Sequence, residues 1–256
     1  MSTPFPGLPG EGFCVARIAS RAIVAAMSVA AHPSRSAPRR ATAARVPGVE
    51  RERAFWDAGM GYVAGIDEVG RGAIAGPLVA AAVILPACSG AKLGALRRRL
   101  SGTRDSKTVT ALGRERLLEP IRAAAVAVGV GIVEHDEFDV LGMSAANRIA
   151  MERAVLALRV PPDALLLDAC TIDLALPQVG AIDADAHCLS VAAASIVAKV
   201  TRDAMMVEHD AADPRYGFAG HKGYGTDLHF ARIVTHGPGP IHRLSIPRVA
   251  NGGLRP

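Results

Sequence analysis

From residue 51 onward, the polypeptide alternates between short apolar runs and longer amphipathic stretches. Apolar runs of roughly four to eight residues bounded by turn residues are typical of buried strands, whereas apolar residues recurring every three or four positions indicate helices. Strands are predicted over 62–66, 78–85, 126–134, 164–168 and 178–182. Helices are predicted over 91–100, 112–125, 145–158 and 189–210, with a short helical turn over 135–141.

Strands interleaved with helices predict an α/β domain. The first two strands are close enough in the chain to form a hairpin, so the predicted five-stranded sheet is mixed rather than purely parallel. The last segment, residues 213–243, is rich in glycine and has weaker periodicity. We therefore expect a mixed five-stranded sheet flanked by helices, followed by a helical and loop-rich C-terminal segment.

The first fifty residues differ in composition from the rest. They are rich in Ala, Arg, Pro and Ser and contain no acidic residue between Glu11 and Glu50. Such a composition is typical of a disordered basic arm or a transit peptide, and a segment upstream of the true translation start is the alternative. We divide the chain into a low-complexity extension, residues 1–50, and a globular domain, residues 51–256.

Composition narrows the class of protein. The chain of 256 residues is half apolar and can bury a sizeable core, and its net charge of +5 favours an anionic partner, nucleic acid first. No apolar run reaches the roughly eighteen uncharged residues of a membrane span. The four cysteines form no C-x-x-C pair, which argues against a disulfide framework or a structural zinc site and favours a reducing cytoplasm.

Two adjacent carboxylates, Asp67 and Glu68, follow the first predicted strand and precede the turn Gly70-Arg71-Gly72. Charges at such a position cost several kcal/mol unless they are paired, metal-bound or at an open sheet edge. Because successive side chains on a strand point to opposite faces, both acids can serve one site only if the strand ends or bulges there. Arg71 is a cation between two glycines, beside backbone N–H groups that the turn would expose, and this combination suits the binding of a phosphate or a sugar hydroxyl. A polar hairpin turn is the competing interpretation.

Further acids follow two later strands. Asp168 ends the apolar run 164–168, while Asp183 and Asp185 follow the last predicted strand. Oxygen-only ligands favour Mg²⁺ or Mn²⁺, and carboxylates from distant segments around two such ions are the usual apparatus for phosphodiester hydrolysis. Strand-end turns and helix capping are the competing explanations for these acids.

Six strings of residues occur in a recognisable order: GIDEVGRGAIAGP from Gly65, DSK from Asp105, LLLDA ending at Ala169, LSVAAASIVAKVTRD from Leu189, HKGYGT from His221 and GPIHR from Gly239. Together they resemble type 2 ribonuclease H (bacterial ribonuclease HII), from about Glu50 to Val249. The resemblance implies a ribonuclease H-like fold and an endonuclease that cuts the RNA strand of RNA–DNA hybrids. It also implies cleavage 5′ of single ribonucleotides in duplex DNA, two divalent cations (Mn²⁺ or Mg²⁺), and products with a 3′-hydroxyl and a 5′-phosphate.

The resemblance also assigns roles to individual residues. The catalytic, metal-binding acids would be Asp67, Glu68, Asp168 and Asp185, with Asp185 preferred to Asp183 because of its spacing to the LSVAAASI run. The turn Gly70, Arg71 and Gly72 would read the ribose 2′-hydroxyl, and Tyr224 would stack on the following sugar. Flanking phosphates would be held by Lys107, Ser195 and Lys199, with Lys222 as an outer candidate. We expect a cytoplasmic monomer that binds RNA–DNA hybrids and ribonucleotide-containing DNA, without a membrane; the sequence indicates no protein partner.

Two departures from the family pattern are visible. Ala169 follows Asp168 where the family has glycine, so the backbone there is less free to adopt positive φ. The GRG turn is followed by Ala73-Ile74 rather than Pro-Leu. Competing hypotheses are another nuclease of the same fold, such as a type 3 hybrid nuclease or a resolvase, and a nucleic-acid-binding module without catalysis. The complete acid set argues against the last, because binding alone gains nothing from negative charge facing phosphate.

Overall fold

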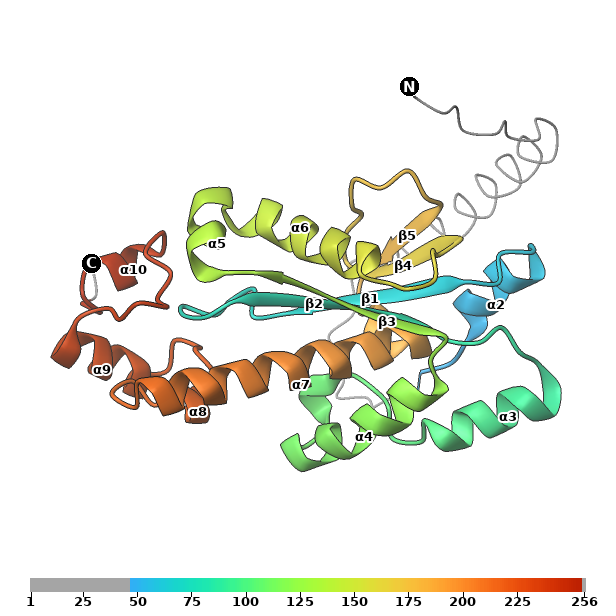
Figure 1. The fold of residues 1–256 in the computed structure, drawn as a ribbon, viewed down its shortest axis with the longest axis horizontal. Coiled ribbons are helices and arrows are strands. Elements are labelled where there is room, and N and C mark those ends of the chain that lie inside the picture. Colours follow the sequence, from blue (N-terminus) through green and yellow to red (C-terminus); the bar gives the residue numbers. More distant parts are fainter. Residues whose placement is uncertain (1–46, 255–256) are drawn as a thin grey trace, which may run out of the picture.

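One mixed sheet organises the fold. The computed structural model of this protein describes residues 47–254, so the predicted extension over residues 1–50 lies almost entirely outside the described residues and stays a prediction. The strands run in the order β3-β2-β1-β4-β5, with β1 antiparallel to β2, β2 antiparallel to β3, and β1, β4 and β5 mutually parallel (Figure 1). Their bounds are β1 Val63–Val69, β2 Leu78–Ile84, β3 Ala127–Val133, β4 Ala164–Asp168 and β5 Gln178–Ala181. The predicted α/β class, mixed five-stranded sheet and initial hairpin are confirmed.

Helices cover both faces of the sheet (Figure 1): α5 and α6 lie on one face, and α3, α4 and α7 on the other. Their bounds are α2 Glu50–Asp57, α3 Gly90–Arg99, α4 Ala111–Ala124, α5 His135–Leu141, α6 Met143–Leu156, α7 Leu189–Ala212, α8 Phe218–His221, α9 Asp227–His236 and α10 Pro247–Ala250, with short 3-10 turns η1 Ser106–Thr108 and η2 Ala184–Ala186. Within the described range, none of these helices is long and apolar enough to cross a membrane.

The C-terminal segment contains more regular structure than its sequence pattern indicated. Helix α9 forms inside the region 213–243, and its first turn is capped by Thr226, whose side chain accepts a hydrogen bond from the backbone N–H of His229 at 3.2 Å. Its buried face consists of His229, Phe230 and Ile233. A histidine on the buried face weakens the apolar periodicity, which explains why the sequence pattern did not give the bounds of this helix.

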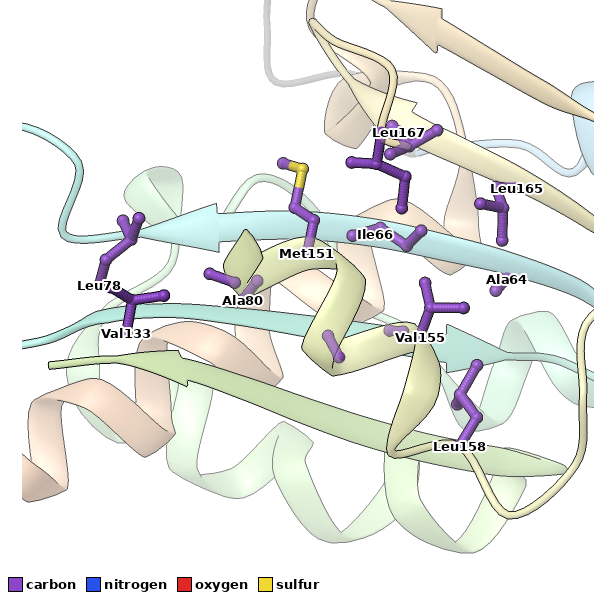
Figure 2. Close-up of a cluster of buried hydrophobic side chains, with 14 of the residues drawn as sticks. Ala64, Ile66, Leu78, Ala80, Val133, Met151, Val155, Leu158, Leu165 and Leu167 are labelled. Atoms are coloured by element: carbon purple, nitrogen blue, oxygen red, sulfur yellow. The ribbon is translucent and has the colours of Figure 1, made fainter. Parts of the chain in front are cut away.

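Side chains of α6 fill one face of the sheet. Figure 2 shows Met151 and Val155 of this helix, and Leu158 just after its end, beside strand residues of β1 and β4. These strand residues are Ala64 and Ile66 of β1 and Leu165 and Leu167 of β4, and residues of β2 and β3 complete the cluster. Because side chains alternate along a strand, the intervening residues of β1 and β4 face α7.

The long helix α7 lies directly against β1. A Cβ atom on Gly65 would lie 2.3 Å from the backbone nitrogen of Val191, so only glycine permits this approach. Ala192, Ala193 and Ala194 are fully buried, and their small side chains keep the helix close to the strands. This packing carries the later turns of α7 past the ends of β1 and β4.

Candidate active site

Carboxylates from separate segments gather at the C-terminal ends of β1 and β4. Ile66 pairs with Leu167 across these parallel strands, so Asp67 and Asp168 come next on neighbouring strands, which lie about 4.8 Å apart. By the alternation along each strand, both side chains face α7. Asp185 arrives from η2, which is tied to β4 because Oδ1 of Asp168 accepts a hydrogen bond from the backbone N–H of Ala184 at 2.8 Å.

Strand β1 neither ends nor bulges at the acids, contrary to the sequence-based expectation. Glu68 pairs with Ala80 and Val69 with Val79, so the ladder with β2 continues to Val69. Pairing with β4, however, stops at Ile66. The side chain of Glu68 lies on the face of the strand opposite to that of Asp67. It is nevertheless close enough to Asp168 to feel its charge: burial, followed by the charge of Asp168, raises the pKa of Glu68.

Burial first, and then neighbouring carboxylates, raise the pKa values of all four acids. Asp67 is 5% exposed, and burial, followed by the charge of Glu68, holds its pKa well above the usual range. Burial, followed by the charges of Asp105 and Asp168, raises the pKa of Asp185 to about 6. Raised carboxyl pKa values of this kind are the result of negative charge concentrated in a poorly solvated place. A divalent cation would offset that charge.

The donor set fits a hard cation, although no ion-binding cage is preassembled. Within residues 47–254, no three histidine, cysteine or carboxylate side chains stand close enough together to form a ready-made metal site. Oδ1 of Asp67 instead accepts a hydrogen bond from the backbone N–H of Glu68 at 2.8 Å. Oε2 of Glu68 is buried with no hydrogen-bond partner in the described chain. Because Asp67 and Asp168 lie on adjacent strands, rotation of side chains rather than movement of the backbone would bring oxygens to a shared Mg²⁺ or Mn²⁺.

Asp105 is a further carboxylate beside this cluster, and the sequence analysis gave it no place among the metal-binding acids. It caps η1, since Oδ1 accepts a hydrogen bond from the backbone N–H of Lys107 at 2.9 Å. Its charge also contributes to the raised pKa of Asp185 and of Asp168. Burial alone would lower the pKa of Lys107, but Asp105 and Asp67 outweigh burial and raise it. Nothing in the spacing of the DSK string pointed to this proximity.

Ser195 lies beneath the acids rather than at the surface. Its side chain is 4% exposed and hydrogen-bonds with Asp67, where it favours the ionised carboxylate. Its hydroxyl also lies 2.9 Å from the hydroxyl of Ser106. A buried hydroxyl in this position orients Asp67 and is poorly placed to bind a phosphate.

Tyr224 is half-buried and has cations beside its ring. The ammonium of Lys199 lies 5.8 Å from the ring centroid, and the guanidinium of Arg202 lies 5.4 Å from it. Lys199 also pairs with Asp203 at 2.6 Å. Lys222 has positive φ, and its ammonium donates to the carbonyl of its own turn at Ala219. The structure therefore brings the side chains of Lys199 and Tyr224 together, whereas the ammonium of Lys222 binds a backbone carbonyl of its own turn.

Three loops interlock beside the acids: the glycine turn 70–77, the loop 221–226 and the loop 239–243. The backbone N–H of Ile74 donates to the carbonyl of Gly223 at 2.9 Å, and that of Gly76 donates to the carbonyl of Ile241 at 2.8 Å. Three of the sequence strings thus form one surface.

The glycines of the GRG turn have different roles. Gly70 has φ +91°, and a Cβ atom there would lie 2.2 Å from Nε of Arg202. Around Gly72, by contrast, no described atom lies within 4 Å of a Cβ position. Gly70 is therefore required by the fold, whereas Gly72 leaves open space in which a ligand can approach the backbone.

The carbonyl of Tyr224 is contacted by buried His229, which is in turn contacted by a second buried histidine, His242. Nδ1 of His229 lies 2.9 Å from that carbonyl oxygen, and Nε2 of His229 lies 3.0 Å from Nε2 of His242. Nδ1 of His242 accepts a hydrogen bond from the backbone N–H of Gly239 at 2.9 Å. One assignment satisfies all of these contacts: His242 carries its proton on Nε2 and His229 on Nδ1. Burial lowers the pKa of each histidine to about 4, so both stay neutral in the folded protein.

These histidines make a pH-dependent contribution to the free energy of unfolding. Because their folded pKa lies below the unfolded value of about 6.5, their contribution is complete above pH 6.5 and is lost as pH falls toward 4. Between pH 7 and pH 5 we expect a loss of about 2 kcal/mol per histidine. Urea unfolding at pH 7 and at pH 5 measures this loss in the free energy of unfolding. His242→Gln should lose less stability than the wild type over this interval, and equal losses would contradict the assignment.

Ala169 adopts a left-handed backbone conformation that favours glycine. Its φ is +61°, directly after Asp168. An L-residue in this region costs about 1–2 kcal/mol. We expect Ala169→Gly to raise the free energy of unfolding by about 1 kcal/mol, after the larger unfolded-state entropy of glycine is subtracted. Urea unfolding tests this, with Ala157→Gly as the matched control: Ala157 has φ −79°, and glycine there should give no gain.

Comparisons with known proteins agree with one another. The ribonuclease HII family model matches residues 64–249. The ribonuclease HII of Geobacillus kaustophilus (strain HTA426) is 48% identical over 198 residues, which cover 77% of this chain and 73% of the relative. The ribonuclease HII of Geobacter metallireducens is 51% identical over 186 residues, covering 72% and 83%.

Solved structures share the fold. The ribonuclease H2 of Pyrococcus horikoshii superposes with a TM-score of 0.61 at 26% identity, covering 75% of this chain and 97% of that one. Bst-RNase HIII, solved in complex with Mn²⁺, gives a TM-score of 0.56 at 18% identity, covering 75% of this chain and 68% of that one. At that identity, the second likeness concerns the fold alone.

Proposed function

This chain belongs to the ribonuclease HII family, and from that premise we propose that Asp67, Glu68, Asp168 and Asp185 hold two divalent cations at the ends of β1 and β4. The protein is a metal-dependent endonuclease of the ribonuclease H type, acting on RNA–DNA hybrids. The observation that carries the proposal is the clustering of carboxylates with raised pKa values beside an open glycine turn.

Each acid is placed by a different part of the fold. Asp67 is fixed by Ser195 and by the backbone N–H of Glu68, while Asp168 anchors the turn that presents Asp185. Divalent cations bound at such a site lower the pKa of water and offset charge on the scissile phosphate. The number of ions and the choice between Mn²⁺ and Mg²⁺ are part of the proposal.

The surface next to the acids fits a ribonucleotide. The exposed turn of Arg71 and Gly72 can approach a 2′-hydroxyl, the group that distinguishes RNA from DNA. We assign the ring of Tyr224 to the next sugar and the cations Lys107 and Lys199 to the flanking phosphates, because Lys107 lies under the influence of the acids and Lys199 lies beside the Tyr224 ring. In this assignment Ser195 positions Asp67, and Lys222 reaches a phosphate only by leaving the carbonyl of Ala219.

We propose that the enzyme also cuts on the 5′ side of a single ribonucleotide in duplex DNA, leaving a 3′-hydroxyl and a 5′-phosphate. A type 3 hybrid nuclease or a resolvase of the same fold is the alternative activity. A binding module without catalysis is disfavoured because clustered acids facing phosphate weaken binding.

One assay separates these alternatives. Three end-labelled duplexes are incubated with Mg²⁺ or Mn²⁺: DNA with one embedded ribonucleotide, the same DNA without it, and a full RNA–DNA hybrid. We expect the hybrid and the embedded ribonucleotide to be cut and the plain DNA to stay intact. Cleavage of the hybrid alone would reject single-ribonucleotide incision, and no cleavage of any duplex with either ion would reject the enzymatic proposal.

A further inference from the structure

Two arginines are buried beneath the glycine turn, where the acid site gives them no role. Arg202 and Arg243 are both 0% exposed and are among the largest fully buried side chains of the described chain. Neither takes part in an ion pair within residues 47–254. Arg243 ends the GPIHR string, whose conspicuous sequence the metal site does not explain.

Arg243 donates hydrogen bonds to several backbone carbonyl groups of the glycine turn. Its Nη1 donates to the carbonyl of Gly70 at 2.7 Å and of Ala73 at 3.0 Å, with a longer contact to that of Arg71 at 3.3 Å. Its Nε donates to the carbonyl of Gly76 at 3.0 Å. The guanidinium therefore holds the turn at both ends.

Arg202 supports the same turn from α7. It donates to the carbonyl of Pro77 at 2.8 Å and to that of Ala75 at 3.1 Å. A third bond, at 2.8 Å, reaches the carbonyl of Lys222 in the neighbouring loop. The two arginines together hold the glycine turn against the loop that carries Tyr224.

The direction of these carbonyls fixes the direction of two N–H groups. In a trans peptide unit the C=O and the following N–H point in opposite directions. The inward carbonyls of Gly70 and Arg71 therefore direct the N–H groups of Arg71 and Gly72 away from Arg243. Among the described residues, no acceptor takes either N–H, and both residues are exposed. Two donors thus face the open space beside Gly72.

Stability alone gives little reason for this arrangement. Burying a cation without a carboxylate partner costs several kcal/mol, and an apolar side chain of similar volume often serves a core better. Here the charge is met by carbonyl dipoles and by the ring of Phe138, 3.9 Å from the guanidinium carbon. Burial, followed by the charge of Arg202, lowers the pKa of Arg243 to about 9. Only arginine offers a rigid fork of five N–H donors, which lysine cannot reproduce.

We propose that Arg243, supported by Arg202, is a positioning residue for ribonucleotide recognition. By holding the carbonyls of the turn inward, it presents the N–H groups of Arg71 and Gly72 to the ribose 2′-hydroxyl and the adjoining phosphate. This inference rests on the proposed function, since it states how the recognition turn of that site is held in shape.

The test measures binding preference rather than turnover. Fluorescence anisotropy, recorded without added divalent cations, gives the affinity for a DNA duplex with one ribonucleotide and for the same duplex without it, in the full-length Asp67→Asn protein, whose turnover is strongly reduced. We expect Arg243→Lys in this background to reduce the ratio of the two affinities by roughly 3–30-fold, as the loss of one or two hydrogen bonds would do. Affinity for the plain DNA should stay the same.

Controls separate positioning from damage to the fold. Arg159→Lys is the matched control, because Arg159 also donates to a backbone carbonyl, that of Val126, but away from the turn; it should keep the full ratio. If Arg243→Lys does not fold, as judged by circular dichroism, Arg202→Lys provides the same test.

The outcomes distinguish the inference from the function on which it rests. An unchanged ratio in a folded variant, or an equal loss of affinity for both duplexes, overturns the positioning role. A parent Asp67→Asn protein with no preference for the ribonucleotide, together with wild-type protein that cuts neither the embedded ribonucleotide nor the hybrid, instead rejects the proposed function.

Discussion

Replacing Asp67 by asparagine is expected to lower the turnover number by about 10²–10⁴-fold, with substrate affinity within a few-fold of the wild type. Asp67 is the most deeply placed acid of the cluster, and its pKa is raised by burial and by Glu68. Asparagine has nearly the same shape and can still accept the hydrogen bond from the backbone N–H of Glu68. What the variant loses is an anionic oxygen ligand, worth several kcal/mol of transition-state stabilisation.

Single-turnover cleavage of the RNA–DNA hybrid measures the rate, and anisotropy measures binding. Asp163→Asn is a suitable control, because Asp163 also accepts a backbone hydrogen bond, from Tyr62 at 2.8 Å, but lies before the start of β4. It should cut at the wild-type rate. The melting temperature of Asp67→Asn should equal or exceed that of the wild type, because the substitution removes a buried charge. Full activity in Asp67→Asn would refute its role as a metal ligand.

The strands were predictable because burial on both faces leaves a simple signal. Strand β4, predicted over 164–168, has the observed bounds, and its first four residues are fully or almost fully buried. Continuous apolar runs are typical of parallel strands covered by helices on both faces. The hairpin of β1 and β2 followed from the short glycine-rich connection. The strand order beyond that hairpin was not predicted, because the apolar pattern does not say which strands are neighbours.

The end of β1 was harder to predict. Asp67 and Glu68 resemble the polar residues that terminate strands, yet β1 continues to Val69. The strand continues because β2 pairs with it residue by residue, so backbone hydrogen bonding outweighs the unfavourable side chains. The sequence pattern of β1 contains no information about its partner strand. For that reason we expected a strand end or a bulge at the acids, and the structure has neither.

The acids were visible in the sequence, but the residues that hold the recognition turn were not. A carboxylate at the end of an apolar run is conspicuous, which is why Asp67 and Asp168 were found. Arg202 and Arg243 act through backbone carbonyls more than a hundred residues away, and carbonyls leave no trace in a sequence. Asp105 likewise fulfils its capping role locally, so its contribution to the charge of the cluster becomes visible only after folding.

Removing and restoring divalent cations should have an effect as large as that of Asp67→Asn. With EDTA we expect no detectable cleavage of the hybrid, and addition of Mn²⁺ or Mg²⁺ should restore it. The same addition should stabilise the fold, by about 2.7 kcal/mol when the free ion is at a hundred times its dissociation constant. The physical reason is that burial, and then repulsion between carboxylates, raises the pKa values of Asp67 and Asp185, and a bound cation offsets the charge that both effects disfavour.

Thermal unfolding with and without the ions provides a measurement that does not depend on catalysis. Asp67→Asn should show a much smaller shift in melting temperature, whereas Tyr224→Ala, which removes only the ring proposed to contact the sugar, should keep the full shift. Ions and protons compete for the same oxygens. Because the pKa of Asp185 is about 6, the stabilisation should weaken as pH falls below 6. An ion-independent melting temperature in the wild type, or an equal shift in Asp67→Asn, would mean that the clustered acids do not bind the cations.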